Sequence, residues 1–233
     1  MKNLVLIPTL FMAACATTGA TGGKSSTAPF PGPAATEKRR LEITDAAKNV
    51  MDCMKPKKGE EQDKGGTFAV VADAGGKLTI TPVKWNGSDA TKQCIVEAGQ
   101  KAPVSAMPGP SVGTMWEFLP PGEKSQPQTP PEELKVKMQG LAATMQAEVT
   151  DCGTRYLGVD FGAQIDIAYF LYNDGRAYAP TVIQSDAKDG GFESCVQEVV
   201  AKEKFPVVSV EKPFGATMHF KIGVYGDTQR RKD

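Results

Sequence analysis

The chain has 233 residues, of which 27 are basic and 27 acidic, so its formal net charge is zero. This balance gives no electrostatic argument for binding nucleic acid or an anionic membrane surface. The hydrophobic fraction of 40% is sufficient for globular cores, and 24 glycines and 17 prolines gather in a few linker-like stretches. The length suits one large domain or two small ones.

Residues 1–14 have the features of a secretory signal peptide. Lys2 precedes an apolar run that is too short to span a bilayer, and small residues stand directly before Cys15. This ending resembles a bacterial lipobox. The resemblance implies cleavage before Cys15, followed by attachment of diacylglycerol and an N-linked acyl chain such as palmitate, which together anchor a protein stably. An ordinary signal peptide with an unmodified cysteine is the alternative.

Ala16 follows this cysteine and, by the same resemblance, implies an outer-membrane lipoprotein that faces the periplasm. Residues 15–40, rich in Gly, Ser, Thr and Pro and without hydrophobic periodicity, predict a disordered tether. The Gly-Gly-Lys-Ser run at 22–25 is not a phosphate-binding loop, because Thr18 stands where that motif needs a glycine and no strand precedes it.

A first module is predicted over residues 41–119, in the order helix, strand, strand, helix, strand. The helices are indicated by apolar residues at a helical period, and the strands by alternation on either side of a glycine turn. Pro82 cannot donate a ladder hydrogen bond, so its strand is expected to be an edge strand or to be bulged there. Cys94 is expected to face inward. The predicted elements are a helix at 41–54, strands at 67–72 and 77–85 around a turn at 73–76, a helix at 90–98 capped by Ser88 or Asp89, and a strand at 111–118.

A proline-rich linker at 120–131 separates this module from a second one at 132–225, and a polar tail at 226–233 follows. The second module has the same predicted order. Pro180 stands in the strand that corresponds to the Pro82 strand. The predicted elements are a helix from 132 that carries Leu141, Met145, Val149 and Cys152, strands at 164–172 and 176–184 around a turn at 173–175, a helix that carries Phe192, Cys195, Val196, Val199 and Val200, and a strand at 214–222.

The two modules are copies of one unit. Cys53 and Cys152 are 99 residues apart, as are Gly76 and Gly175, and the offset grows to 103 by Thr114 and Thr217. Insertions in loops account for this drift. The predicted fold class is therefore α+β, with two tandem α-β-β-α-β modules, each a three-stranded antiparallel sheet with two helices on one face.

Four cysteines lie on these helices, one on each. If the helices are neighbours, Cys53 can pair with Cys94 and Cys152 with Cys195, closing loops of 41 and 43 residues. Each such loop closure contributes roughly 4 kcal/mol in the chain-entropy model. A metal site is the alternative, but two thiolates without a nearby histidine make a poor zinc site, and export favours oxidation. We expect two disulfides, with no metal and no cofactor.

These residues resemble the TonB C-terminal domain, especially its variant in gliding-motility envelope proteins. That variant carries a cysteine in each helix, a Gly-containing hairpin turn, Cys-Val in the second helix, then Phe-Pro and a Phe-rich last strand. The second module matches at Cys152, Asp174-Gly175, Cys195-Val196, Phe205-Pro206 and Phe214 to Phe220. The first module has Cys94-Ile95 and Ala102-Pro103 instead. The resemblance covers residues 41–119 and 132–225 and implies the fold. TonB itself has an inner-membrane helix, which a lipobox replaces here.

No catalytic residues are predicted. His219, the only histidine, is expected to take a polar role on the last strand, with no nucleophile in view. Asp174 is explained by the turn and Asp166 by a polar strand face. Trp85 and Trp116 suit the core or a sheet edge better than a ligand platform. The Cys-x-x-Cys motif of thiol oxidoreductases does not occur in the sequence.

The sequence therefore predicts a non-enzymatic, lipid-anchored protein of the cell envelope that binds or scaffolds protein partners, for example in a motility or transport assembly. Sheet edges near Pro82 and Pro180 are expected to be exposed and able to add a partner strand. The alternative is a periplasmic protein that binds a small molecule or a cell-wall glycan between its modules.

Overall fold

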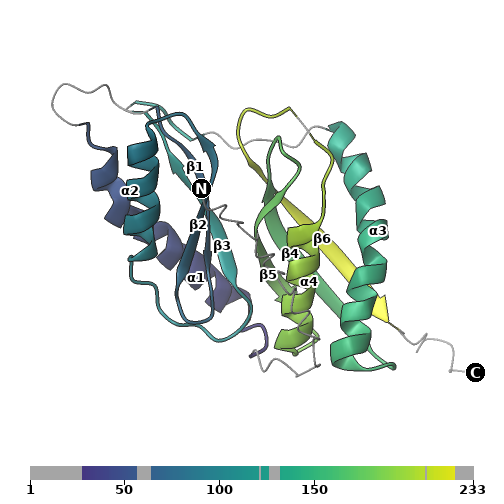
Figure 1. Cartoon of the computed structure of the whole chain (residues 1–233). Helices are drawn as coiled ribbons and strands as arrows, with labels where there is room; N and C mark the ends of the chain where they lie inside the picture. The colour runs from purple at the N-terminus through teal and green to yellow at the C-terminus, as the bar shows by residue number, and fades with distance from the viewer. Residues whose placement is uncertain (1–27, 57–63, 121, 126–131, 208, 224–233) are drawn as a thin grey trace, which may run out of the picture.

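The computed structural model describes residues 28–56, 64–120, 122–125, 132–207 and 209–223. The predicted signal peptide, the predicted lipidation site at Cys15 and the predicted polar tail lie outside these ranges. Two three-stranded antiparallel sheets stand next to each other, and the helices of each module cover the outer face of its own sheet (Figure 1). The predicted α+β class and the two tandem modules are confirmed.

The first module contains two helical segments that precede its hairpin and one that follows it. Its strand order is β2-β1-β3, so the first strand of the hairpin is central. Its elements are α1 (Pro33–Ala46), the 3₁₀-helix η1 (Ala47–Met54), β1 (Gly66–Ala72), β2 (Leu78–Trp85), α2 (Asp89–Gln100) and β3 (Val112–Phe118).

The prediction of a disordered tether up to residue 40 is wrong for its last part, because α1 begins at Pro33. Proline is well suited to the first turn of a helix, where its missing N–H is not needed. This helix has no clear apolar stripe in the sequence, because two of its buried residues, Thr36 and Arg39, are polar. Arg39 is only 2% exposed, and its guanidinium donates to the Asp73 carbonyl oxygen at 3.1 Å and lies 3.5 Å from the Glu42 carboxylate.

Pro82 lies on an edge strand and beside a bulge, so both expectations for it are met. Thr67 pairs with Lys84 and Phe68 with Pro82, which leaves Val83 as the extra residue of β2. Ser88 caps α2 as predicted, accepting from the Thr91 amide at 3.1 Å. Cys94, however, is exposed rather than inward, because Ile95 and Gly99 supply the buried face of this helix.

The second module repeats this arrangement with strand order β5-β4-β6. Its hairpin turns at Gly175, which has a φ of 67° and donates from its amide to the Tyr172 carbonyl at 3.1 Å. Pro180 lies at a bulge, where the register between Ala168 and Phe170 shifts by one residue. The elements are α3 (Glu132–Leu157), β4 (Gly162–Leu171), β5 (Ala177–Ser185), α4 (Gly190–Lys202) and β6 (Phe214–Gly223).

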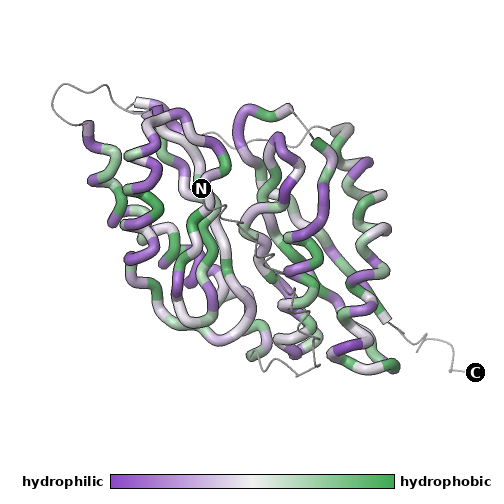
Figure 2. The backbone as a smooth tube through the Cα atoms, viewed as in Figure 1, coloured by the Kyte–Doolittle hydropathy of each residue, from purple (hydrophilic) through white to green (hydrophobic). Residues whose placement is uncertain are grey.

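Each module has its own hydrophobic core between helices and sheet. Figure 2 shows hydrophobic residues along the strands of both sheets and hydrophilic ones interspersed along the helices. Trp116, 2% exposed, belongs to the first core and donates from Nε1 to the Ile43 carbonyl at 2.9 Å, while half-buried Trp85 packs on Phe68 with ring centroids 5.4 Å apart. Both tryptophans therefore have the core or edge role that was expected.

Candidate functional site

The two modules meet through the helix-free faces and the facing edges of their sheets. Gly113 of β3 donates its amide hydrogen to the Thr181 hydroxyl of β5 at 2.8 Å. A Cβ on Gly113 would lie 2.6 Å from the Cβ of Ala179, so only glycine allows β3 to approach this closely. Gln197 of α4 donates from its side-chain amide to the carbonyl oxygens of Ser111 and Pro180 and so bridges the same boundary.

This contact corrects the expectation of an exposed edge near Pro180. Ala179 and Thr181 on either side of it are only 5% and 2% exposed, because β3 of the first module covers them. By contrast, the strand order places no neighbour beyond β2 in the described structure, and Thr79, Thr81 and Pro82 are exposed there. The edge near Pro82 therefore remains open to a partner, whereas the edge near Pro180 does not.

Beside the contact, the sheets diverge and enclose a cleft made of three adjoining cavities. The inner cavity, about 330 Å³, lies on the helix-free face of β4, β5 and β6, with Gly113 and Arg40 on its other side. The middle cavity, about 320 Å³, shares Phe170 and Gly215 with the inner one. The outer cavity, about 450 Å³, shares Thr67, Glu117 and Lys212 with the middle one. The three volumes fall within the usual range for small-molecule pockets, roughly 300–1,000 Å³.

An ion pair crosses this cleft. Lys212 Nζ lies 2.8 Å from the Glu117 carboxylate, and each side chain is 24% exposed. Partial burial alone would raise the pKa of Glu117, but hydrogen bonds from Lys212 and Ser125 and the charge of Lys212 bring it below the ordinary value of 4.5. Lys84 adds a second bridge by donating from Nζ to the Glu211 carbonyl oxygen at 2.8 Å. The cleft is thus lined by charges of both signs, and one ion pair and one lysine–carbonyl hydrogen bond span it.

His219 and Asp166 lie on the helix-free face of the second sheet. They are register partners on β6 and β4, and the imidazole Nδ1 contacts the Asp166 carboxylate. His219 is 56% exposed and Asp166 24%. This is the cross-strand polar role predicted for His219. Asp174 is also explained as expected, because its carboxylate accepts from the Arg176 amide in the hairpin turn.

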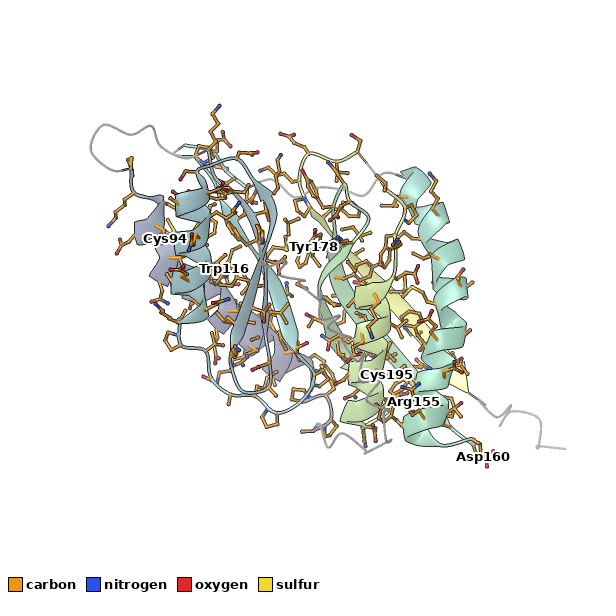
Figure 3. The ribbon with its side chains drawn as sticks, viewed as in Figure 1. Cys94, Trp116, Arg155, Asp160, Tyr178 and Cys195 are labelled. Carbon is orange, nitrogen blue, oxygen red and sulfur yellow. A yellow bond between two sulfur atoms is a disulfide. The ribbon has the colours of Figure 1, made fainter. Side chains whose placement is uncertain are left out.

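Tyr178 stands at the end of the hairpin near the boundary between the modules (Figure 3). Its hydroxyl donates to the other oxygen of Asp174 at 2.6 Å. Burial, reinforced by this carboxylate, raises the pKa of Tyr178 well above its ordinary value. The phenol therefore stays protonated and acts as a hydrogen-bond donor that stiffens the turn.

A buried carboxyl ties the segment before α1 to the second module, a contact that the sequence did not suggest. Glu193 is 0% exposed and its Oε2 accepts from the Phe30 amide at 2.5 Å. Its Oε1 has no hydrogen-bond partner among the described atoms. Burial is the main reason that the pKa of Glu193 is raised. Because Phe30 also packs on the second core, the segment that leads into the first module is fastened to the second.

The predicted disulfides are confirmed. The Cys53–Cys94 and Cys152–Cys195 sulfurs lie 2.02 and 2.07 Å apart. Figure 3 places Cys94 on the helical side of the first module and Cys195 on α4 of the second, so neither lies in the cleft. Cys15 is outside the described residues.

Within the described ranges, no cluster of three or more His, Cys, Asp or Glu side chains is placed to bind a metal ion. Among the helices that the structure describes, none combines the length and apolar character needed to cross a membrane.

Comparison with known proteins identifies no relative of this chain. No protein-family model matches the chain, and neither curated proteins nor solved structures yield a match.

Proposed function

We propose that this chain is a non-enzymatic lipoprotein of the cell envelope that binds protein partners through the open edge of β2. The proposal combines the lipobox-like ending at Cys15 with the TonB-like modules. It rests chiefly on one observation, that the edge of β2 is open whereas the equivalent edge of β5 is covered. An assembly for motility or transport is the kind of partner that the family resemblance suggests.

The open edge is suited to a short partner strand. β2 begins at Leu78, and its outward side chains up to Pro82 are the exposed Thr79 and Thr81. Pro82 offers no N–H and Val83 is bulged, so a partner strand would pair with residues 78–81 and stop there. Main-chain hydrogen bonds of this kind supply affinity, and the side chains on the partner supply specificity.

Lipidation would keep the molecule close to a bilayer. The structure is described from residue 28, which is 28 − 15 = 13 residues after Cys15. An extended chain of that length spans at most about 45 Å, at about 3.5 Å per residue. Because Phe30 is docked against Glu193, the tether ends before residue 30 and not at residue 40. The modules would therefore reach a shorter distance from the bilayer than a tether of residues 15–40 would allow.

The binding proposal is tested with a photo-reactive amino acid introduced at Thr81 in the full chain, in cells. We expect a discrete crosslinked adduct at this position and none from the same probe at Thr154, an exposed residue of α3. Thr79→Lys should abolish the adduct, because a charged side chain on an edge strand disfavours pairing. Equal adducts at Thr81 and Thr154, or none at Thr81, would contradict the proposal.

The anchor is tested separately with Cys15→Ser. The parent protein should fractionate with membranes and incorporate a fatty-acid analogue. The variant should do neither. Membrane association that persists in the variant without label would show that Cys15 is not the anchor, while leaving the β2 proposal standing.

A second candidate function is supported by the cleft, in which a small molecule or cell-wall glycan would lie between the sheets. Its walls carry the hydroxyls of Thr67 and Ser125 beside the ring of Phe170. A Cβ on Gly215 would meet only the Phe170 ring, at 3.8 Å, so Gly215→Leu should fill the middle cavity without disturbing the backbone. Calorimetry measures the binding of cell-wall oligosaccharides. Binding should vanish in this variant and persist in Gly140→Leu, at an exposed position of α3. Absence of binding to the parent would exclude this candidate.

A further inference from the structure

We propose that the Cys53–Cys94 disulfide is a site of thiol–disulfide exchange, opened by a dithiol reductant under conditions in which Cys152–Cys195 stays closed. The proposal concerns the first module alone and does not depend on the binding functions above. It rests on differences between two disulfides that the repeat makes equivalent in sequence.

The first difference is the exposure of the cysteine residues. Cys94 is exposed and its partner Cys53 is half-buried, whereas Cys195 is half-buried and its partner Cys152 is only 2% exposed. Cys152 belongs to the second core, whereas Cys53 only packs against the first. A thiolate must reach a sulfur atom to attack it, so the rate of exchange depends on this access.

The second difference is the helix that each disulfide holds. Cys53 lies in η1, an eight-residue 3₁₀-helix, although 3₁₀ geometry rarely persists beyond about four residues. Within η1, the buried residues are Val50 and Met54. Cys152 lies instead in the 26-residue α3, which also buries Met145 and Val149. The first disulfide therefore holds a short element with weak hydrogen bonds that can move to admit a thiolate, whereas the second is held in place by a long, packed helix.

The exchange has a defined course. A thiolate of the dithiol attacks Sγ of Cys94, because this cysteine is exposed. The new sulfur–sulfur bond forms as the Cys53–Cys94 bond breaks, and the bonding pair leaves on Sγ of Cys53 as a thiolate that water protonates. The second thiol of the reductant, as a thiolate, then attacks the reductant sulfur that is bonded to Cys94 in the mixed disulfide. Cys94 is released as a thiolate, the dithiol becomes a disulfide, and two electrons have passed to the protein.

Timed reduction of the purified full chain tests the order of opening. The oxidised protein is treated with dithiothreitol, quenched with acid and alkylated, and each cysteine is then quantified by peptide mass spectrometry. Cys53 and Cys94 should become labelled together, at least about tenfold faster than the other pair, with the tertiary circular dichroism retained. Equal rates, earlier labelling of Cys152 and Cys195, or reduction only after unfolding would overturn the proposal.

A variant and a monothiol sharpen the result. In Cys53→Ser/Cys94→Ser, the remaining disulfide should keep the slow rate that it has in the parent. A fast rate would mean that the first disulfide protects the second, against the argument from local access. With glutathione as the attacking monothiol, the mixed disulfide should form on Cys94. An adduct found mainly on Cys53 would refute the assignment of the attacked sulfur.

Discussion

The amide of Gly113 donates a hydrogen bond of 2.8 Å to the hydroxyl of Thr181, across the boundary between the two modules. Gly113 is the register partner of Val71 on β1, and Gly215 is the register partner of Phe170 at the equivalent place on β4, so both modules have glycine at this position. Only Gly113 is pressed against the other module, where an added Cβ would collide with Ala179, whereas a Cβ on Gly215 would meet only the Phe170 ring. Equivalent glycines are therefore used unequally by the two modules.

Replacement of Thr181 by Val should weaken this junction. The hydroxyl is buried, so its loss leaves the Gly113 amide without an acceptor, at a cost of about 1–3 kcal/mol in the free energy of unfolding. Thr154→Val, at an exposed position of α3, is the control, and its free energy of unfolding should change by no more than about 0.5 kcal/mol. Urea unfolding of the two variants measures both values. Equal effects would mean that the Thr181 hydrogen bond contributes nothing specific.

Gly113→Val should separate the modules rather than unfold them. Its side chain has no space beside Ala179, and overpacking of this kind costs about 1–3 kcal/mol where the surroundings cannot adjust. Small-angle X-ray scattering should show a larger radius of gyration while far-ultraviolet circular dichroism is unchanged. Gly140→Ala, where an added Cβ meets nothing within 4 Å, should leave the radius unaltered. An unchanged radius in Gly113→Val would refute the assigned contact.

Lys212→Met should raise the pKa of Glu117. In the folded parent this pKa lies below 4.5, so the ion pair adds stability above that pH and loses it as the pH falls through the folded value. Without Lys212, partial burial dominates and the pKa rises, while the free energy of unfolding near neutrality drops by up to about 1 kcal/mol. Carboxyl chemical shifts followed by NMR against pH measure the change. Lys202→Met, which breaks the exposed pair with Glu198, should leave Glu117 unaffected.

Glu193→Gln should remove a dependence of stability on pH. Burial holds the pKa of Glu193 above the ordinary 4.5, so the protonated carboxyl favours folding below that pH. This contribution to stability disappears as the pH rises through the folded pKa, because the buried carboxyl then loses its proton. A glutamine side chain does not titrate, so the variant is free of this loss. The variant should therefore gain stability relative to the parent as the pH rises above 4.5. Urea unfolding across this range measures the difference, with Glu198→Gln on the exposed side of α4 as control. Parallel pH profiles for parent and Glu193→Gln would contradict the expectation.

The sequence by itself determined the local elements, because each has a signal within a few residues. The turns at Gly76 and Gly175 need positive φ, observed at 91° and 67°, and Pro82 and Pro180 mark interruptions of the strand ladder. The repeated spacing of Cys53–Cys94 and Cys152–Cys195 indicated which cysteines pair. In each module, these local signals predict the order of helices and strands, and the equivalence of the two modules follows from that order.

Only the tertiary structure decided how these elements are used. The buried polar face of α1 is held by Arg39, which reaches the Asp73 carbonyl, and the segment before α1 is docked through Phe30 and Glu193, 163 positions apart. The edge near Pro180 is covered by β3 of the first module. Such contacts join residues that are distant in the chain and leave no periodic pattern, so local physics cannot reveal them. Equivalent cysteines and equivalent edges thus became unequal through packing alone: one disulfide and one sheet edge are exposed, while their copies are covered.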